Sequence, residues 1–418
     1  MSNEIIYLDA NSMTFMSEDV IKFMNKWTNK GHPDGDYQSA KDCKKLIKSF
    51  KEQILLEVLG DEQKNDFNVS IFNSASEANV TFIRNCVQSY AAITKTLPHI
   101  IISDIEHKSI TNVCKELVEC GLCQLDIAGL ARQTLGDDLA GLARQTIGDG
   151  LAGLARQTLG DGLTVGLTTG LARQTLGDGL ENKSIENKIL KLIRPNTCLI
   201  SISATNSLSG EIYNLKSISI IAKQKNIPFH SDVVQIFSRS VFHLVVNGLD
   251  SCTANFYKMH GPTGIGILVT SNKLIEGYKL KLNNYSIPNI PAIAGALFAY
   301  RTMLEKRAEK NTNLLKLKKI FIETINDFIQ SKKTKTQIIW LSDIENYMEN
   351  TILFSLDNLN TKETLISEFE KHNIIVFIVS KKENIVLFRI SFTDNTTLEE
   401  IKKVIKIIAA GIGRRLLG

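Results

Sequence analysis

The sequence predicts an α/β protein whose large domain is built on a mainly parallel sheet covered by helices, with a smaller α+β domain at the C-terminal end. Between residues 67 and 270, short apolar runs alternate with amphipathic stretches, as in parallel strands joined by helices. Beyond residue 270 this alternation stops. The chain has 418 residues, more than one hydrophobic core usually holds, which also favours two domains.

The N-terminal part has the pattern of a strand, a helix, a loop and a second helix. Ile5–Leu8 is a short apolar run, and Ser17–Trp27 carries apolar residues at helical spacing. The segment Gly31–Asp36 interrupts this pattern, and Tyr37–Leu59 then predicts a long amphipathic helix. We expect residues 1–16 to form an N-terminal segment ahead of the large domain.

The large domain is expected to span residues 17–270. Its predicted strands are Asn68–Phe72, His99–Ser103, Leu199–Ser203, Pro228–His230, Ser251–Asn255 and Gly264–Thr270. Its predicted helices between these strands are 74–93, Ser109–Glu119 and Ile218–Gln224. Because ligands of parallel sheets bind at the carboxyl ends of the strands, we expect a functional site there.

A repeated segment, residues 128–180, interrupts the large domain. The unit AGLARQTLGDGL recurs there with a period of twelve, and the segment holds 12 of the chain's 26 glycines but no lysine or aromatic residue. A twelve-residue period does not keep the leucines on one helix face, and the Gly-Asp-Gly breaks interrupt any helix. We therefore predict a surface insertion, either disordered or a chain of short helical turns, rather than a solenoid.

The C-terminal domain is expected at residues 271–410, with long helices first and strands later. Its predicted elements are the helices Ile293–Glu305 and Thr312–Gln330, the strands Thr351–Leu356, Ile374–Val379 and Asn384–Phe392, and a final helix Thr397–Ala409. The tail, residues 411–418, is expected to be unstructured.

Composition argues against several kinds of partner. The formal net charge of +5 comes from 49 basic and 44 acidic residues spread along the chain, which does not suggest nucleic-acid binding. The chain shows no targeting segment and no run of eighteen apolar residues, so we expect a soluble, cytoplasmic protein without a membrane partner. Seven irregularly spaced cysteines fit free thiols, and the lone pair Cys120 and Cys123 is poor evidence for metal or redox chemistry, so no metal site is predicted.

Polar residues follow four of the predicted strands. The small hydroxyl residues and backbone N–H groups of residues 73–77 would suit a phosphate, or they would simply cap the next helix. His107 could stack on an aromatic cofactor or act in acid–base work, and Asn206 could reach a ring hydroxyl or form a turn. Asp232 is costly to bury unless it meets a cation such as a protonated pyridine nitrogen, although it could also cap a helix. Gln235, three residues after Asp232, points to the same side as Asp232 if a helical turn begins at that point.

Lys258 lies in the stretch Ser251–Gly266, between an apolar run and a Gly-Pro-x-Gly-x-Gly turn. A lysine held away from water between buried strands has a lowered pKa and becomes a nucleophile suited to a Schiff base. On this stretch alone an exposed loop lysine is the more common outcome. The order of serine cluster, His107, Asn206, Asp232 and Lys258 along the chain is much more specific.

This order resembles the NifS-like cysteine desulfurases of the class-V aminotransferase family, which are fold-type I pyridoxal-phosphate (PLP) enzymes. YLDANSMT resembles the family's YLDNNATT, NSASEAN its SGATEAN, IEHKSI its IEHPAV, HSDVVQ its HTDAVQ, and KMHGPTGIG its KFYGPKGVG. The resemblance covers most of residues 5–300 outside the repeat. It implies a fold-type I PLP-transferase-like fold, PLP as cofactor, a small cysteine-like amino acid as substrate, and a homodimer.

The resemblance also implies a role for individual residues of this chain. Lys258 would bond to PLP and move the substrate's α-proton, Asp232 would pair with the pyridine nitrogen, and His107 would stack on the ring. Asn206 and Gln235 would reach the ring oxygen. The residues that would hold the phosphate are Ala75, Ser76, Asn255 and Tyr257.

The C-terminal third both extends and departs from the resemblance. LFRISF resembles the family's IRFSLGRFT, which would make Arg389 the clamp on a substrate carboxylate, or else an exposed strand arginine. The family's desulfurases carry a nucleophilic cysteine on a mobile loop there, whereas this chain has no cysteine after Cys252, and Asn283–Ile287 replaces the family's RSGT turn. The reading is a PLP-dependent enzyme without that cysteine loop. The alternatives are a degenerate member with a binding or regulatory role, and a PLP-dependent lyase or aminotransferase.

Overall fold

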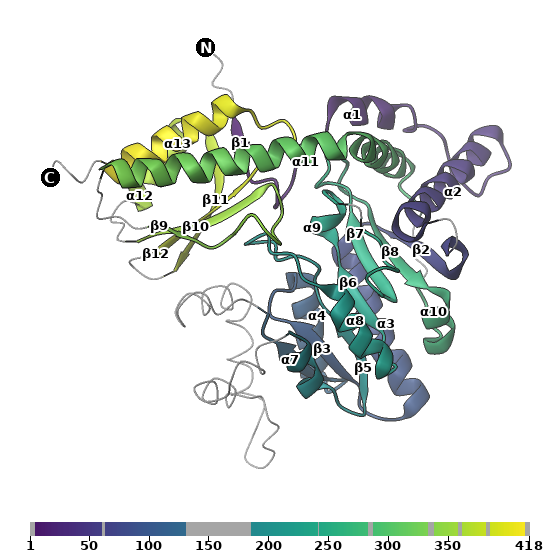
Figure 1. The fold of residues 1–418 in the computed structure, drawn as a ribbon. Coiled ribbons are helices and arrows are strands. Elements are labelled where there is room, and N and C mark those ends of the chain that lie inside the picture. Colours follow the sequence, from purple (N-terminus) through teal and green to yellow (C-terminus); the bar gives the residue numbers. More distant parts are fainter. Residues whose placement is uncertain are drawn as a thin grey trace.

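Across the residues it describes, the computed structural model contains two sheets, one in each domain, and one long helix that passes from the first domain to the second (Figure 1). The structure describes residues 5–60, 63–130, 185–240, 242–282, 287–332, 338–357, 362–381 and 385–413. No helix in these ranges is both long enough and apolar enough to cross a membrane.

The large sheet has, in the described part of the chain, the strand order β2-β8-β7-β6-β5-β3-β4. The strands are β2 (Phe67–Phe72), β3 (His99–Ser103), β4 (Gln124–Ala128), β5 (Thr197–Ser201), β6 (Phe229–Asp232), β7 (Ser251–Asn255) and β8 (Gly266–Ser271). β8 is antiparallel to both neighbours and the other pairs are parallel, so the predicted mainly parallel sheet is confirmed. β7 and β8 are consecutive and antiparallel, so they can be joined without a crossover helix, and Lys258 lies in their short connection.

Helices cover both faces of this sheet. They are α1 (Glu18–Asn25), α2 (Gln38–Leu59), α3 (Ala75–Thr94), α4 (Lys108–Glu119), α7 (Ile185–Leu192), α8 (Leu215–Gln224), α9 (Val234–Phe237) and α10 (Asn272–Tyr278), with a 3-10 turn at Lys64–Asp66. Ile100 and Ile102 of β3 belong to the core under α3, α4 and α10, whereas Ile101 belongs to the core under α2, α7 and α8. Apolar residues on both sides of the strand therefore explain why each face needs its own layer of helices.

The smaller sheet has, in the described ranges, the order β1-β11-β12-β10-β9. Its elements are β1 (Ile6–Leu8), β9 (Ile338–Trp340), β10 (Thr351–Asp357), β11 (Ile374–Lys381) and β12 (Ile385–Ser391), with helices α12 (Lys362–Lys371) and α13 (Leu398–Gly413). β1 runs parallel to β11, with Ile6 opposite Ile374, and Ile6 and Leu8 enter the core of this domain. The N-terminal segment therefore contributes a strand to the C-terminal domain.

The long helix α11 (Ile290–Lys332) was predicted as two helices, and that prediction was wrong. Its first part packs with α1 and α2 against the large domain, and its second part packs with α13 in the smaller domain (Figure 1). The stretch between the two predicted helices, residues 306–311, is KRAEKN. It contains neither glycine nor proline and is rich in helix-forming residues, so nothing in it stops the helix.

Two predicted boundaries also need correction. Ala128, assigned to the start of the repeat, ends β4, where it is buried and pairs with Ser103. Helix α13 continues to Gly413, into the tail that was expected to be unstructured, because glycine weakens a helix but removes no backbone hydrogen bond. The rest of the repeat, residues 131–180, lies outside the described residues.

A charge cluster joins the two domains where α11 passes the segment after β12. Asp394 forms ion pairs with Arg239 and, at 2.9 Å, with Lys310, and His260 Nε2 lies 3.8 Å from its carboxylate. Burial acts to raise the pKa of the Asp394 carboxyl, but Arg239 and Lys310 outweigh it and hold the pKa at about 2. The cluster therefore joins the two domains through ion pairs that are largely shielded from water.

Replacing Asp394 by asparagine should destabilise the protein in a pH-dependent way. The pKa of Asp394 is lower in the folded than in the unfolded state, so its contribution is present above about pH 4 and is lost as pH falls through 2. We expect Asp394→Asn to lower the free energy of unfolding by about 2 to 3 kcal/mol at pH 7, and by less near pH 3. Urea unfolding at a series of pH values measures this. The control Asp36→Asn, at an exposed position, should change nothing, and a pH-independent loss in Asp394→Asn would contradict the argument.

Candidate active site

Lys258 lies in the connection between β7 and β8, and the residue is only 8% exposed. Burial lowers the pKa of its amine to about 7, although the negative charges of Asp232 and Asp9 act in the opposite direction. A large share of the amine is therefore uncharged near neutral pH and able to act as a nucleophile.

Glycine is required at two points of this connection because other chain segments approach closely. A Cβ on Gly266 would lie 2.2 Å from the backbone carbon of Ser74, and a Cβ on Gly261 would lie 2.6 Å from the carbonyl oxygen of Phe256. The first approach brings the start of β8 against the start of α3. The turn that carries Lys258 and the predicted phosphate-binding helix start are therefore neighbours.

The N-terminal segment holds the Lys258 turn from outside. The Thr14 amide and hydroxyl both donate to the Tyr257 carbonyl, at 3.1 and 2.8 Å. The same hydroxyl oxygen accepts from the His260 amide at 2.8 Å, and the Ser17 amide donates to the His260 carbonyl at 3.1 Å. His260 has a φ of 60°, an uncommon left-handed conformation for a non-glycine residue, and these bonds on both sides keep it there.

Asp232 ends β6 and is held by a buried chain of polar groups. Asn79 Nδ2 donates to Asp232 Oδ2 at 2.9 Å, and the Val234 amide donates to Oδ1 at 3.0 Å. The N-cap of α9 is Val233, so Asp232 does not cap that helix as the alternative interpretation expected. Behind Asn79, the amide oxygen lies 3.3 Å from His230 Nε2, and His230 Nδ1 lies 2.8 Å from Ser251 Oγ. Burial lowers the pKa of His230 to about 3, so its ring is neutral and leaves the Asp232 charge available for a cation.

His107 is brought to the same place as the N-cap of α4. Its Nδ1 accepts from the Ser109 amide at 3.1 Å, and Asn79 Nδ2 lies 3.3 Å from the Ser109 hydroxyl. Desolvation lowers the pKa of the His107 ring, with Asp232 opposing this effect and Lys258 adding to it. The structure thus brings three predicted residues, Lys258, Asp232 and His107, within electrostatic range of one another.

The start of α3 forms a capping box. The Ser74 hydroxyl accepts from the Glu77 amide at 3.0 Å, and the Glu77 carboxylate accepts from the Asn73 amide at 2.8 Å, which confirms the capping interpretation. A helix leaves its first-turn amides without intrahelical acceptors, so those of Ala75 and Ser76 remain suited to an anion. Capping and anion binding therefore use different groups of the same segment.

Asn255 and Tyr257 flank the Lys258 turn with further polar groups. Asn255 is 1% exposed at the end of β7, and its Oδ1 has no hydrogen-bond partner among the described residues. Burial raises the pKa of the Tyr257 hydroxyl, so it stays protonated and able to donate. An unused buried polar atom beside a buried amine is costly unless something else occupies the site.

Asn206 and Gln235 already have partners. The Asn206 side-chain oxygen accepts from the amides of Leu208 and Ser209 at 2.8 and 3.2 Å, so the residue is a turn former. Gln235, in α9, is buried, and its Nε2 donates to the Asn11 carbonyl at 3.0 Å. Neither bond reaches toward a ring oxygen, and that predicted contact stays a prediction.

Arg389 lies on β12, is 5% exposed and is not the exposed strand arginine of the alternative reading. Its guanidinium forms an ion pair with Asp9 and donates to the Ser12 hydroxyl at 2.7 Å and the Ser207 carbonyl at 3.0 Å. It also lies over the Phe377 ring, 4.1 Å from the centroid. A substrate carboxylate would have to share this guanidinium with Asp9.

Asn11 is a site residue that sequence reasoning missed. Its Nδ2 donates to Thr351 Oγ1 at 2.9 Å and to the Ser207 carbonyl at 3.2 Å, and its Oδ1 accepts from Asn350 at 3.1 Å. Its carbonyl receives the bond from Gln235. Asn11 therefore ties the large domain to the small one beside the Arg389 cluster. It lies in YLDANSMT, so closer attention to every polar residue of that motif could have found it.

The thiols of the described residues do not provide a nucleophile at this site. Every cysteine is described, and all but Cys120 are buried. Burial raises the pKa of Cys123 and of Cys198 to about 12, which keeps these thiols protonated and inert. Cys120 is the C-cap of α4, at the opposite end of the helix from His107 and about 20 Å away at 1.5 Å per residue.

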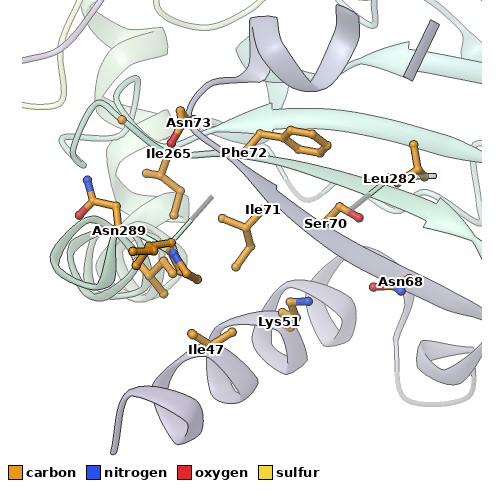
Figure 2. Close-up of a pocket in the computed structure, with 14 residues that line it drawn as sticks. Ile47, Lys51, Asn68, Ser70, Ile71, Phe72, Asn73, Ile265, Leu282 and Asn289 are labelled. Atoms are coloured by element: carbon orange, nitrogen blue, oxygen red, sulfur yellow. The ribbon is translucent and has the colours of Figure 1, made fainter. Parts of the chain in front are cut away.

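A cavity of about 240 Å³ lies between α2, β2 and the start of α11 (Figure 2). Lys51 and Ile47 of α2 face Ile71 of β2 across it, and burial lowers the pKa of Lys51. None of the residues predicted for cofactor or substrate binding lines this cavity. Its lining includes Asn73, just before the α3 start, and Gly264 and Ile265 of the Lys258 connection, so the cavity adjoins the candidate site.

Comparisons with known proteins find class-V aminotransferases and cysteine desulfurases. The family model for class-V aminotransferases matches residues 178–283, the part of the chain that contains Asn206, Asp232 and Lys258. The chain is 22% identical to a "putative cysteine desulfurase IscS 1" of Bacillus subtilis, over 78% of this chain and 73% of the relative. It is 24% identical to the "NifS-like protein" of African swine fever virus, over 86% of each chain. A cysteine desulfurase of Nostoc is 22% identical, but the match spans 60% of its length.

Solved structures show the same fold. A NifS-like protein from Rickettsia africae superimposes with a TM-score of 0.71 and 21% identity, covering 98% of this chain and 99% of the other. A structure described as SspA in complex with cysteine gives a TM-score of 0.63 and 17% identity, covering 94% and 100%. The fold is thus that of the fold-type I PLP transferases, as predicted. The chain is therefore similar in sequence to class-V aminotransferases and cysteine desulfurases, and it shares the fold of NifS-like proteins.

Proposed function

We propose that this protein is a PLP-dependent enzyme that acts on a small, cysteine-like amino acid. One observation carries the proposal: a buried lysine amine with a lowered pKa, an aspartate at a strand end and a histidine at a helix cap converge at one place. Relatives named as cysteine desulfurases, and a structural neighbour described with bound cysteine, support the substrate class. A cytoplasmic homodimer is part of the proposal on the family resemblance alone.

The described residues fit PLP. The cofactor carries a phosphate, a ring nitrogen that binds a proton, and an aldehyde. The first-turn amides at Ala75 and Ser76 suit the phosphate. Asn255, whose Oδ1 has no partner among the described residues, lies beside them because its cross-strand neighbour Gly266 packs against the start of α3. Asp232 has only neutral hydrogen-bond donors in the described structure, as a residue waiting for a protonated nitrogen should.

When bound, PLP supplies an aldehyde that reacts with amines and a ring that accepts electrons from the substrate's α-carbon. The chain's own residues then hold and move protons. Asp232 keeps a proton on the ring nitrogen, and the buried Asn79 fixes the carboxylate in position. His107, whose pKa is lowered by desolvation, would lie against the ring as a flat neutral side chain. Lys258, with a pKa of about 7, can accept and return the substrate's α-proton near neutral pH.

The reaction outcome follows from what the described site contains. Arg389 offers a guanidinium for a substrate carboxylate, and the described thiols are either buried or at the far end of α4. Since no cysteine follows Cys252, a protein persulfide of the family's type has no place to form. We therefore infer a PLP-dependent elimination or amino transfer rather than desulfuration.

The Asp9–Arg389 ion pair favours a second candidate, a degenerate member with a binding or regulatory role. An internal carboxylate that permanently occupies the guanidinium would keep a substrate carboxylate out. The two candidates separate when PLP-loaded protein is screened with small amino acids, following the cofactor's absorbance and the products formed. The enzyme should convert at least one amino acid to an oxo acid. Bound PLP with no response to any amino acid would favour the binding role, and sulfide with alanine from cysteine would contradict our choice of reaction.

Replacing Arg389 by lysine should weaken substrate binding without loss of cofactor. Lysine keeps the charge but cannot hold a carboxylate with two parallel N–H groups, so we expect the apparent Kd of the amino acid to rise about tenfold or more. Amino-acid titrations of the PLP-loaded variant measure this. Arg301→Lys on α11 is the matched control, because Arg301 is exposed. An unchanged Kd in Arg389→Lys would show that the substrate carboxylate binds elsewhere.

A further inference from the structure

Glu106 is a buried carboxyl group that the proposed function does not use. The residue is 1% exposed, and no lysine, arginine or histidine forms an ion pair with it in the described structure. Its Oε1 accepts from the Ser103 hydroxyl and, at 2.7 Å, from the Ser203 amide, and its Oε2 accepts from the Ser203 hydroxyl at 2.6 Å. A buried acid with three donors and no cation needs a functional reason.

The position of Glu106 connects parts of the active site that lie on different strands. Ser103 ends β3, and Ser203 comes just after the neighbouring strand β5. Glu106 therefore joins the carboxyl ends of these two strands, where the site lies. The next residue, His107, is the N-cap of α4, and its ring interacts electrostatically with Asp232 and Lys258.

The hydrogen bonds between Glu106 and Ser203 also connect Glu106 to Asp232 through the backbone. Ala204, the residue after Ser203, donates its amide to the Asp232 carbonyl at 3.0 Å. Glu106 thus lies between His107 on one side and the end of β6 on the other. Any change in its three hydrogen bonds is transmitted to both residues that would contact the cofactor ring.

The charge on Glu106 is finely balanced. Burial and, more weakly, the negative charge of Asp232 raise the pKa of its carboxyl, whereas the hydrogen bonds from Ser103 and Ser203 lower it, and the result is about 7. The other titratable groups that face this region are His107, Lys258 and the Cys114 thiol of α4. A positive charge placed beside Asp232 removes part of the repulsion that keeps Glu106 protonated.

We propose that Glu106 is a positioning residue that holds His107 and the β5 end in place and that releases its proton when the cofactor binds beside Asp232. This inference rests on the proposed function. By linkage, a group that loses a proton on binding makes binding tighter as pH rises. The proton passes to solvent, and no bond other than O–H is broken. The ionised form is also the one that three donors satisfy best, since a carboxylate only accepts.

The test measures PLP binding to the apo-protein, without activity, by titration at pH 6 and pH 8. If the cofactor lowers the pKa of Glu106 by about one unit, ionising Glu106 is worth about tenfold in affinity. Because the titration is incomplete at both of these pH values, the ratio of the Kd at pH 6 to that at pH 8 should then be about fivefold larger in the wild type than in Glu106→Gln. Contributions from Lys258, His107 and the cofactor phosphate are common to both proteins and cancel. Glu119→Gln, at an exposed position of α4, should keep the wild-type ratio.

A second variant covers the case in which Glu106→Gln does not fold. Ser203→Ala removes one hydroxyl donor and should move the pH midpoint of PLP binding upward. Equal Kd ratios in wild type and Glu106→Gln, or an unmoved midpoint in Ser203→Ala, would overturn this inference and leave the proposed function intact. Failure of the wild type to bind PLP at either pH would overturn both.

Discussion

Lys258→Ala should leave a folded protein that has lost its turnover. The side chain is the buried nucleophile of the site and the group placed to move the substrate's α-proton, so we expect kcat to fall at least 10³-fold. Its amine makes no ion pair in the described structure, and removing a partly charged buried group should not unfold the chain. The melting temperature should change by only a few degrees.

The measurement for Lys258 combines turnover with covalent labelling. Protein incubated with PLP and reduced with borohydride should carry the cofactor's mass on the peptide that contains Lys258, and Lys258→Ala should carry none. Lys51→Ala is the matched control, because Lys51 also has a pKa lowered by burial but lies at the separate cavity. Labelling that persists in Lys258→Ala, or disappears in Lys51→Ala, would sink the assignment.

Asp232→Asn should have the second largest effect. The substitution keeps the size of the side chain and one oxygen for Asn79 or the Val234 amide, but it removes the negative charge that a protonated ring nitrogen needs. Breaking a buried charge pair costs about 3 to 5 kcal/mol, which corresponds to a loss of about 10² to 10³ in kcat. PLP should bind more weakly as well.

Steady-state turnover at saturating PLP, with an absorbance spectrum of the loaded variant, tests Asp232→Asn. The exposed variant Asp36→Asn again serves as the control. If the Asp232→Asn variant kept the wild-type kcat, this carboxylate would not face the ring nitrogen. The hydrogen bonds of Asp232 with Asn79 and with the Val234 amide would then be its whole function.

The sequence was sufficient where local pattern decides structure. Except for β4, which was not predicted, the strands of the large sheet and the helices α2 and α4 lie within a few residues of the predicted bounds. Lys258, Asp232 and His107 were identified because each follows a strand, and parallel strands bring their carboxyl ends to one edge. The order of the motifs along the chain, and their resemblance to those of a PLP-dependent family, indicated the cofactor.

The missed features depend on contacts between distant parts of the chain. Asn79 and Glu106 lie inside motifs, but a buried polar side chain on a helix or in a turn looks like a surface residue until its partners are known. The ion pair of Arg389 with Asp9 joins positions near opposite ends of the sequence, and no local pattern announces it. Continuity of α11 was missed because two apolar stripes were read as two helices, although nothing between them stops a helix.

The pairing of β1 with β11 sets the order in which this molecule can be completed. Ile6 and Ile374 are about 370 positions apart, so a ribosome has made most of the chain before β1 can find its partner. The seven strands of the large sheet are all synthesised by Ser271, well before β11 emerges. Closing so long a loop is slow, and until it closes the apolar side chains of Ile6 and Leu8 have no core to enter. The small domain should therefore be the last part to fold. The chain is most prone to aggregate during synthesis before this domain has formed.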